Sequence, residues 1–131
     1  MMGFRKIRRN EDGSAAIEMA IAVPVLITMI YGLFRFGLLY EANAGMSHAL
    51  GEGARYATLY PTPADATIKT RMENALFGKG YGNFVVSDPA SDATSKTLTI
   101  TYTTPLNFLF FSVPNVTLTR TKKVYTPAAG A

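Results

Sequence analysis

The chain has 131 residues, which is enough for one small folded domain beside any membrane segment. It contains no cysteine, and this excludes disulfides, thiolate nucleophiles and cysteine-based zinc sites. The formal net charge is +4, but four of the 13 basic residues lie within the first nine positions. No aromatic-lined basic patch or recognition motif accompanies that cluster, so we do not expect nucleic acid as a partner.

The first predicted element is an apolar helix that follows a short basic leader. The leader is residues 1–13, and residues 15–34 carry a single charged side chain, Glu18. Twenty helical residues span about 30 Å, the hydrocarbon thickness of a bilayer. Pro24 lies inside this run, and a membrane helix tolerates it because unfolding in lipid would leave more backbone groups unpaired. We predict a helix over 14–60, with the membrane span at about 15–40.

The flanking charges predict how this helix is oriented. The basic residues before the span are Arg5, Lys6, Arg8 and Arg9. No lysine or arginine occurs between 36 and 54, so the positive-inside rule places the N-terminus in the cytoplasm and the C-terminal part across the membrane. A cleaved secretory signal has the same polarity, but its apolar region is about 7–15 residues, shorter than the one here.

Beyond the span, the helix is predicted to continue almost to Pro61. Gly45, Ala49, Gly53 and Ala57 recur at every fourth position. On a helix they form one stripe of small side chains, which allows another helix to approach closely. A glycine-rich loop is the alternative, because each helical glycine costs about 1 kcal/mol relative to alanine. The regular spacing and the lack of turn dipeptides favour the helix.

The remaining residues, 61–131, predict a small α+β periplasmic head. A short helix is expected over 66–77, capped by Asp65 or Thr67. Strands are expected at 84–86, 96–104 and 115–126, forming an antiparallel sheet of two or three strands. The loop between the last two strands carries Phe108, Leu109, Phe110 and Phe111. This apolar run is interpreted either as closing the core or as contacting lipid or a partner subunit.

No cofactor, metal site or enzymatic centre is predicted. His48 is the only histidine, and no cysteine is present to join it in a transition-metal site. Asp88 and Asp92 lie in a polar segment whose spacing fits no EF-hand loop. The glycine-rich segment 78–83 lacks the lysine–hydroxyl pair of a phosphate-binding loop. A membrane-tethered periplasmic enzyme is therefore an alternative hypothesis, but no cluster of polar residues supports it.

A glycine, an apolar helix beginning at Ser14, and a glutamate at the fifth position after Gly13 together resemble the start of a type IV prepilin. The nearer resemblance is to the TadE-like minor pilins, or pseudopilins, of the tight-adherence (Flp) pilus system. It covers 12–60 and includes Pro24 and the later Gly53-Ala54-Arg55. One departure is Met19, where major pilins commonly have tyrosine.

This resemblance implies a processed subunit of the bacterial inner membrane. A prepilin peptidase would cleave after Gly13 and leave Ser14 as the new N-terminus. The implied partners are other minor pilins, the major pilin and the pilus assembly platform. The implied role is initiation, tip formation or assembly of a pilus used in adhesion and biofilm formation. An unprocessed single-span scaffold protein of the pilus secretion apparatus is the main alternative.

Glu18 has a physical interpretation in this setting. A carboxylate at the centre of a membrane helix costs a few kcal/mol, and less near the interface. Glu18 lies about one turn inside the run, so its side chain could simply reach the headgroups. Alternatively, cleavage creates an α-amine at Ser14, and an amine with a pKa near 7.7–8.0 is mostly protonated at pH 7. Pairing of this amine with Glu18 of an adjacent subunit would fix the register of assembly.

Overall fold

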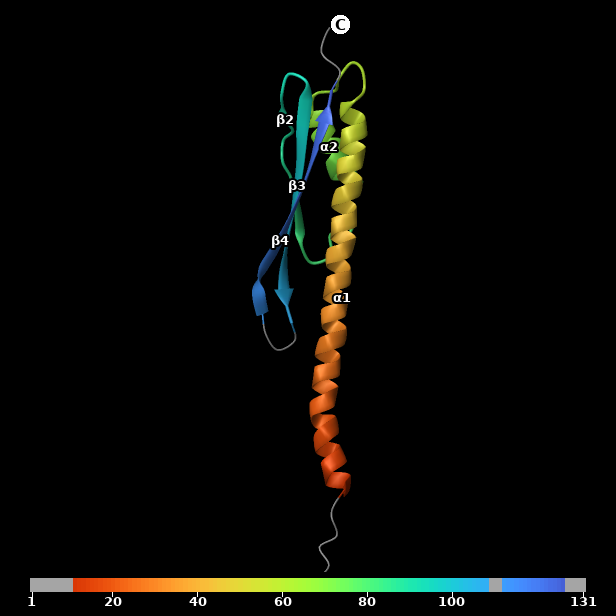
Figure 1. The fold of residues 1–131 in the computed structure, drawn as a ribbon, viewed down its shortest axis with the longest axis vertical. Coiled ribbons are helices and arrows are strands. Elements are labelled where there is room, and N and C mark those ends of the chain that lie inside the picture. The colour runs from red at the N-terminus through yellow and green to blue at the C-terminus, as the bar shows by residue number, and fades with distance from the viewer. Residues whose placement is uncertain (1–10, 109–111, 127–131) are drawn as a thin grey trace, which may run out of the picture.

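The structure is a computed structural model that describes residues 11–108 and 112–126. The four basic leader residues and Leu109, Phe110 and Phe111 lie outside the described residues. The dominant element is helix α1, Glu11–Ala57, whose 47 residues correspond to a length of about 70 Å. The C-terminal half of α1 belongs to the head, and its N-terminal half projects away from it (Figure 1).

Helix α1 passes through Pro24 as one element, as expected for the predicted span. The hydroxyl of Thr28 donates a hydrogen bond of 2.8 Å to the Pro24 carbonyl oxygen. The helix ends at Ala57, three residues before the predicted end, and a bend over 58–61 leads into the next helix.

Helix α2, Asp65–Ala75, is shorter at its C-terminal end than predicted. Ala64 occupies the N-cap position, and no side chain caps the helix, so the prediction of a cap by Asp65 or Thr67 is wrong. The physical reason is competition for the carboxylate: Asp65 accepts hydrogen bonds from Lys96 and Ser91 instead. Ile68 and Met72 form the buried face of α2.

The sheet contains four antiparallel strands in the described part of the chain: β1, Asn83–Val86; β2, Ala90–Ser91; β3, Ser95–Asn107; and β4, Ser112–Tyr125. Strand β3 is central, with β1 and β2 along one edge and β4 along the other. This confirms the predicted α+β class, with one short helix and an antiparallel sheet in the head. The additional strand is β2, whose two residues are too few to show an alternating pattern.

The β3–β4 hairpin is longer than the sequence suggested. Leu106 pairs with Val113 and Asn107 with Ser112, so most of the predicted loop belongs to the strands. Pro105 lies at a register shift between Thr104 and Leu106, a position where a strand accommodates a residue without an N–H donor.

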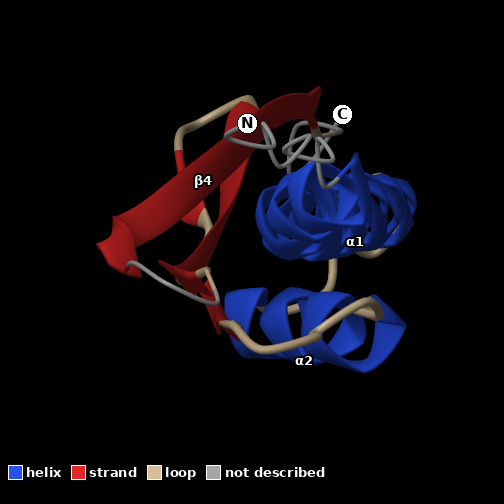
Figure 2. Ribbon diagram, turned by 90° about the horizontal axis from the view of Figure 1, so that it is seen from below, coloured by secondary structure: helices blue, strands red, loops and turns tan. Residues whose placement is uncertain are grey.

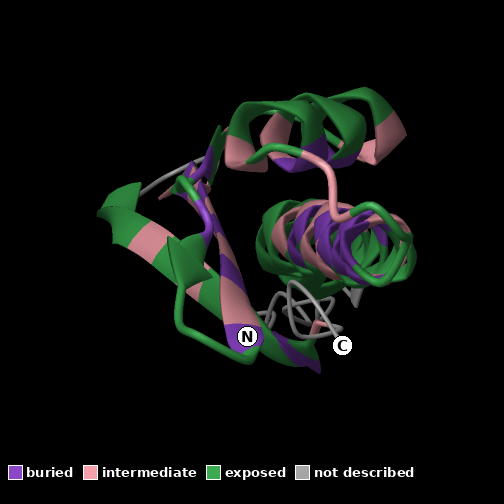
Figure 3. Ribbon diagram, turned by 90° about the horizontal axis from the view of Figure 1, so that it is seen from above, coloured by how far each residue is buried: buried purple, intermediate pink, exposed green. Residues whose placement is uncertain are grey.

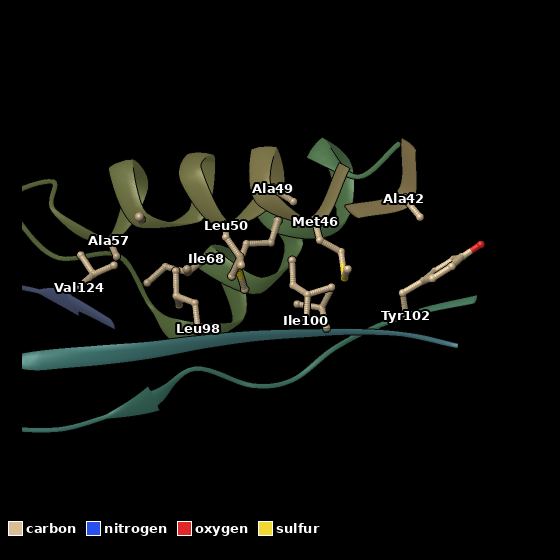
Figure 4. Packing of buried hydrophobic residues seen from close by; sticks show 13 residues of the cluster. Ala42, Met46, Ala49, Leu50, Ala57, Ile68, Leu98, Ile100, Tyr102 and Val124 are labelled. Atoms are coloured by element: carbon tan, nitrogen blue, oxygen red, sulfur yellow. The ribbon is translucent and has the colours of Figure 1, made fainter. Parts of the chain in front are cut away.

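The two helices pack side by side against one face of the sheet (Figure 2). The buried residues of α2 face α1 and the sheet (Figure 3). Leu98, Ile100 and Tyr102 alternate along β3 and meet Met46 and Leu50 of α1 in the core (Figure 4). The opposite face of the sheet carries threonine hydroxyls that pair across β3 and β4, as at Thr101 and Thr119 with 3.4 Å between oxygens.

Candidate functional site

The free half of α1 is an apolar surface that the described part of the chain leaves uncovered. All residues from Gly13 to Ile27 are exposed, and large side chains such as Ile17 are 67 % accessible. This part of α1 is long and apolar enough to cross a membrane, judged by its length and composition. An apolar surface of this extent needs lipid or other helices around it, so α1 provides a membrane anchor.

Glu18 is exposed on this free half, and no ion pair involves it among the described residues. It lies about 25 Å along the helix from Arg35, the next charged residue of α1, given a rise of about 1.5 Å per residue. Nothing in the head can therefore neutralise the Glu18 carboxylate within the same chain.

The predicted cleavage position, Gly13 and Ser14, lies in the first turns of α1, and both residues are exposed. A Cβ atom added at Gly13 would have no atom within 4 Å. Glycine in a helix costs about 1 kcal/mol relative to alanine, and packing within the described chain gives no compensation at this position. The packing of the described chain therefore does not require a glycine at this position.

The stripe of small residues packs inside the head. Gly45, Ala49, Gly53 and Ala57 are all buried. A Cβ at Gly45 would lie 2.1 Å from the carbonyl oxygen of Phe77, just after α2. A Cβ at Gly53 would lie 2.4 Å from Cγ of Met72 in α2. The helix that uses this close approach is thus α2 of the same chain.

Two further glycines on α1 lie outside that packing and were not predicted from the sequence as a helix contact. Added Cβ atoms at Gly37 and Gly51 would meet nothing within 4 Å. They are fourteen positions apart in a helix of 3.6 residues per turn, so they lie on nearly the same side of α1. This side, not the buried stripe, is available for close approach by another helix.

Arg35 follows directly on the apolar run at 15–34, and its contacts were not predicted from the sequence. It is 9 % exposed. Its Nε and Nη2 donate hydrogen bonds of 2.9 and 2.6 Å to the hydroxyl of Tyr31. The guanidinium carbon lies 5.1 Å from the ring centre of Tyr31 and 4.2 Å from that of Tyr81. Within the described residues no carboxylate pairs with it, so two tyrosine rings hold this cation.

Ion pairs join the elements of the head. Glu52 of α1 lies 3.2 Å from Arg55 and 3.2 Å from Arg71 of α2, and hydrogen bonds from Arg55 first, then Arg71, lower its pKa. Asp65 pairs with Lys96 of β3, whose hydrogen bond lowers the pKa of that carboxyl. Lys69 lies 2.9 Å from Asp88, and its pKa is raised by that hydrogen bond. These pairs tie α2 to its neighbours.

No set of three His, Asp or Glu side chains close enough to hold a metal ion occurs in the described ranges. His48 is exposed, and its ring centre lies 5.8 Å from that of Phe77 in a tilted arrangement. Its ring therefore has an aromatic neighbour in the described part of the head.

Phe108 is the one member of the predicted aromatic run that the structure describes. It is partly buried, and its Cε1 atom would lie 3.5 Å from a Cβ added at Gly32 of α1. The closed end of the hairpin therefore contacts α1 inside the apolar run, below the level of Arg35.

The comparisons with known proteins concern the long helix. Residues 13–55 match the model of a family described as TadE-like protein. No curated protein and no solved structure matches the chain. The matched residues are those that carry the resemblance seen in the sequence, including Gly13, Glu18 and Pro24. The family match confirms that resemblance over residues 13–55, about a third of the chain.

Proposed function

We propose that the chain is a minor pilin of a tight-adherence pilus, anchored in the bacterial inner membrane with its N-terminus in the cytoplasm and its head in the periplasm. The observation that carries this proposal is the free half of α1: residues 13–27 are exposed, apolar apart from Glu18, and TadE-like. A helix of this kind has two suitable surroundings, a bilayer and a bundle of similar helices. A pilin uses both, one before assembly and one after.

Processing by a prepilin peptidase would convert one state into the other. The precursor carries Arg5, Lys6, Arg8 and Arg9, which hold its N-terminus at the cytoplasmic surface. A charged leader is costly to bury among apolar helices, so its removal is a condition for entering a filament. Cleavage after Gly13 would remove all four basic residues, together with Glu11 and Asp12, in one step. Gly13 has no packing role in the head, which fits a residue selected by an external peptidase.

Glu18 would then acquire its partner from the neighbouring subunit. The new α-amine at Ser14 lies four residues before Glu18, so the two groups are about one helical turn apart along α1. A small axial offset between adjacent helices brings the amine of one subunit to the carboxylate of the next. In an environment with little water, each charge is satisfied only in that register, and the pair then selects one mode of assembly.

The helix surface proposed for contact with other minor pilins and the major pilin is the side that carries Gly37 and Gly51. The stripe at 45, 49, 53 and 57 is buried inside the head, with Gly45 against Phe77 and Gly53 against Met72, and cannot serve. Open glycines on a helix exposed to other helices allow close backbone approach. Engagement of the pilus assembly platform, and a role in pilus initiation or tip formation with adhesion and biofilm formation as the outcome, belong to the proposal because of the resemblance to TadE-like minor pilins.

N-terminal sequencing of the protein from sheared pili and from membranes tests the proposal. A start at Ser14 in the pilus fraction is the expected result. A start at Met1 found only in the membrane fraction would instead support the second candidate, an unprocessed single-span scaffold of the secretion apparatus. One observation favours that candidate: α1 is continuous across Gly13 and Ser14, so the predicted cleavage position is part of the helix.

A matched pair of variants tests the cleavage site. Gly13→Leu should leave a longer product that stays in the membrane. Gly37→Leu places the same side chain at another open position of α1 and should be processed normally. If wild type and both variants give products of the same length, the protein is not cleaved after Gly13 and that part of the proposal is wrong.

The register role of Glu18 is tested by Glu18→Ala and Glu18→Asp. We expect Glu18→Ala to be cleaved but excluded from pili, and Glu18→Asp to retain part of the incorporation because its carboxylate remains. Normal incorporation of cleaved Glu18→Ala would show that the carboxylate serves only to reach the headgroups.

A further inference from the structure

The β3–β4 hairpin runs beside α1 and reaches into the part of the helix assigned to the membrane. At its open end Val124 packs near Ala57, the last residue of α1 (Figure 4). At its closed end Phe108 contacts α1 at Gly32. From Gly32 to Ala57 the helix rises about 37 Å, and the strand from Lys96, the partner of Val124, to Phe108 extends about 40 Å. The two lengths agree, and in Figure 1 the hairpin runs alongside α1 at an angle, with the start of β4 displaced to the side of the helix.

Burial along α1 marks where this contact begins. Residues 13–27 are exposed, whereas Thr28 and Tyr31 are partly buried and Gly32 is buried. These residues precede Arg35, the first charge after Glu18, and therefore belong to the apolar run. Along the axis of α1, the closed end of the hairpin thus lies beside the last turns of the apolar run.

Charge is distributed along the hairpin in the same direction. No charged residue occurs between Lys96 and Arg120, and this interval contains the entire closed end. The basic residues Arg120, Lys122 and Lys123 lie toward the open end, where they pair in register with residues 97–100. A hairpin that is uncharged at one end and basic at the other is suited to a boundary between lipid and water.

Arg35 marks the height of that boundary. It is held between the rings of Tyr31 and Tyr81, and tyrosine and arginine are the residues expected where a span leaves the hydrocarbon. Gly32 is three residues nearer the membrane centre, so Phe108 lies about 4–5 Å on the lipid side of Arg35. This is the depth at which interfacial apolar groups enter a bilayer.

The backbone of the hairpin can tolerate this depth. Antiparallel pairing continues through Leu106 with Val113 and Asn107 with Ser112. Paired strands satisfy their inward-facing N–H and C=O groups. The outward-facing groups of both strands still need water or headgroups, so the pairing suits the interfacial depth and not the hydrocarbon centre. Val113 is 37 % exposed beside this end and has no polar group to desolvate.

We propose that the closed end of the hairpin, residues 105–108 and 112–116, inserts into the periplasmic leaflet of the bilayer that α1 crosses. The occupant of this apolar surface is lipid, and the head is then attached to the membrane by α1 and by the hairpin together. The inference rests on the proposed function in one respect, namely that α1 spans the bilayer with the head outside.

The chain has no tryptophan, so a single introduced tryptophan reports its own position. The test uses the full chain in phosphatidylcholine–phosphatidylglycerol vesicles, with and without phospholipids brominated near the glycerol end of the acyl chains. Phe108→Trp probes the hairpin end. Met29→Trp, 62 % exposed on the span, is the lipid-facing control. Tyr125→Trp, 73 % exposed at the open end of the same hairpin, is the water-facing control.

We expect the fractional loss of emission for Phe108→Trp to be at least roughly twice that for Tyr125→Trp, with emission at shorter wavelength, because quenching depends on depth. Weak quenching of Phe108→Trp beside strong quenching of Met29→Trp would overturn the hairpin proposal and leave the anchor intact. Weak quenching of all three tryptophan variants would overturn both the hairpin proposal and the membrane anchor. If Phe108→Trp is protected from aqueous acrylamide yet unaffected by brominated lipid, a protein surface, such as a second copy, covers the hairpin end and the proposal is wrong.

A second measurement avoids altering Phe108. The chain lacks cysteine, so Asn107→Cys and Thr119→Cys each provide one thiol on the same hairpin. Both native residues are exposed in the protein alone. In vesicles, a membrane-impermeant maleimide should label Asn107→Cys much more slowly than Thr119→Cys, and the difference should disappear in urea-unfolded, detergent-dissolved protein. Equal labelling rates in vesicles would contradict insertion.

Discussion

Replacing Gly45 by alanine should destabilise the head, although alanine is the better helix former. The added Cβ would lie 2.1 Å from the carbonyl oxygen of Phe77 and 3.2 Å from its nitrogen. The obstacle is backbone, so α1 and the segment after α2 would have to separate by about 0.9 Å to reach even 3.0 Å, the lower limit of real contacts. Overpacking of this kind costs about 1–3 kcal/mol, and this clash falls at the upper end.

The gain in helix propensity from glycine to alanine is about 1 kcal/mol, so the net loss for Gly45→Ala is about 2 kcal/mol. For a folded head of this size, a change of 1 kcal/mol shifts Tm by about 4–8 °C, and we expect a decrease of about 8–16 °C. Gly51→Ala is the matched control: its Cβ meets nothing within 4 Å, so the propensity gain should raise Tm by a few degrees.

Both variants are measured as full chains in detergent micelles, with unfolding followed by the near-ultraviolet signal of the tyrosines. Buried Tyr102 makes that signal sensitive to the head. Opposite shifts for the two variants are the expected result. If Gly45→Ala is as stable as wild type, or rises together with Gly51→Ala, the close packing of α1 on α2 is wrong.

Three further changes probe the core and one ion pair. Met72→Ala removes a fully buried side chain and should lower the free energy of unfolding by about 2–5 kcal/mol in urea titration; a loss below about 1 kcal/mol would contradict its place in the core. Tyr102→Phe deletes the hydroxyl that donates to the Lys79 carbonyl at 2.9 Å and should cost about 1 kcal/mol, whereas an unchanged midpoint would argue against that bond. Lys96 lowers the pKa of Asp65 in the folded state, so the pair stabilises fully above the ordinary value of 3.8, and this contribution is lost as pH falls through the lowered pKa. Below pH 4, wild type should therefore lose more free energy of unfolding than Asp65→Asn does. The difference should be less than about 1 kcal/mol because the carboxylate is partly exposed. If both proteins lose the same stability in acid, the ion pair does not stabilise the head.

The long helix and the strands could be predicted because their patterns are local. The run at 15–34 is apolar on all sides, and this property needs no knowledge of the fold. Leu98, Ile100 and Tyr102 alternate with threonines, and that period assigns one face of β3 to the core before any partner is known. The family match at 13–55 falls on this same locally encoded segment.

The failed details depend on competition between groups far apart in sequence. Asp65 has the residue type and position of a helix cap, but Lys96, thirty-one residues away, takes its carboxylate. Strand β2 exists only because the central strand offers unpaired backbone groups beside Ala90 and Ser91. The hairpin loop was expected to be longer because prolines flank it, and a register shift after Thr104 accommodates one of them.

The sequence alone determined that this protein has a membrane-length helix with a single carboxylate near its start, followed by a small α+β head, because length, charge and periodicity are properties of neighbouring residues. It could also show that Gly45, Ala49, Gly53 and Ala57 share one side of a helix. Only the tertiary structure decided that this side is buried inside the head against α2, the segment after it and the sheet, and that Phe108 lies against Gly32. Such pairings join residues separated by tens of positions, and their choice depends on which surfaces can be buried together in three dimensions, which no local pattern contains.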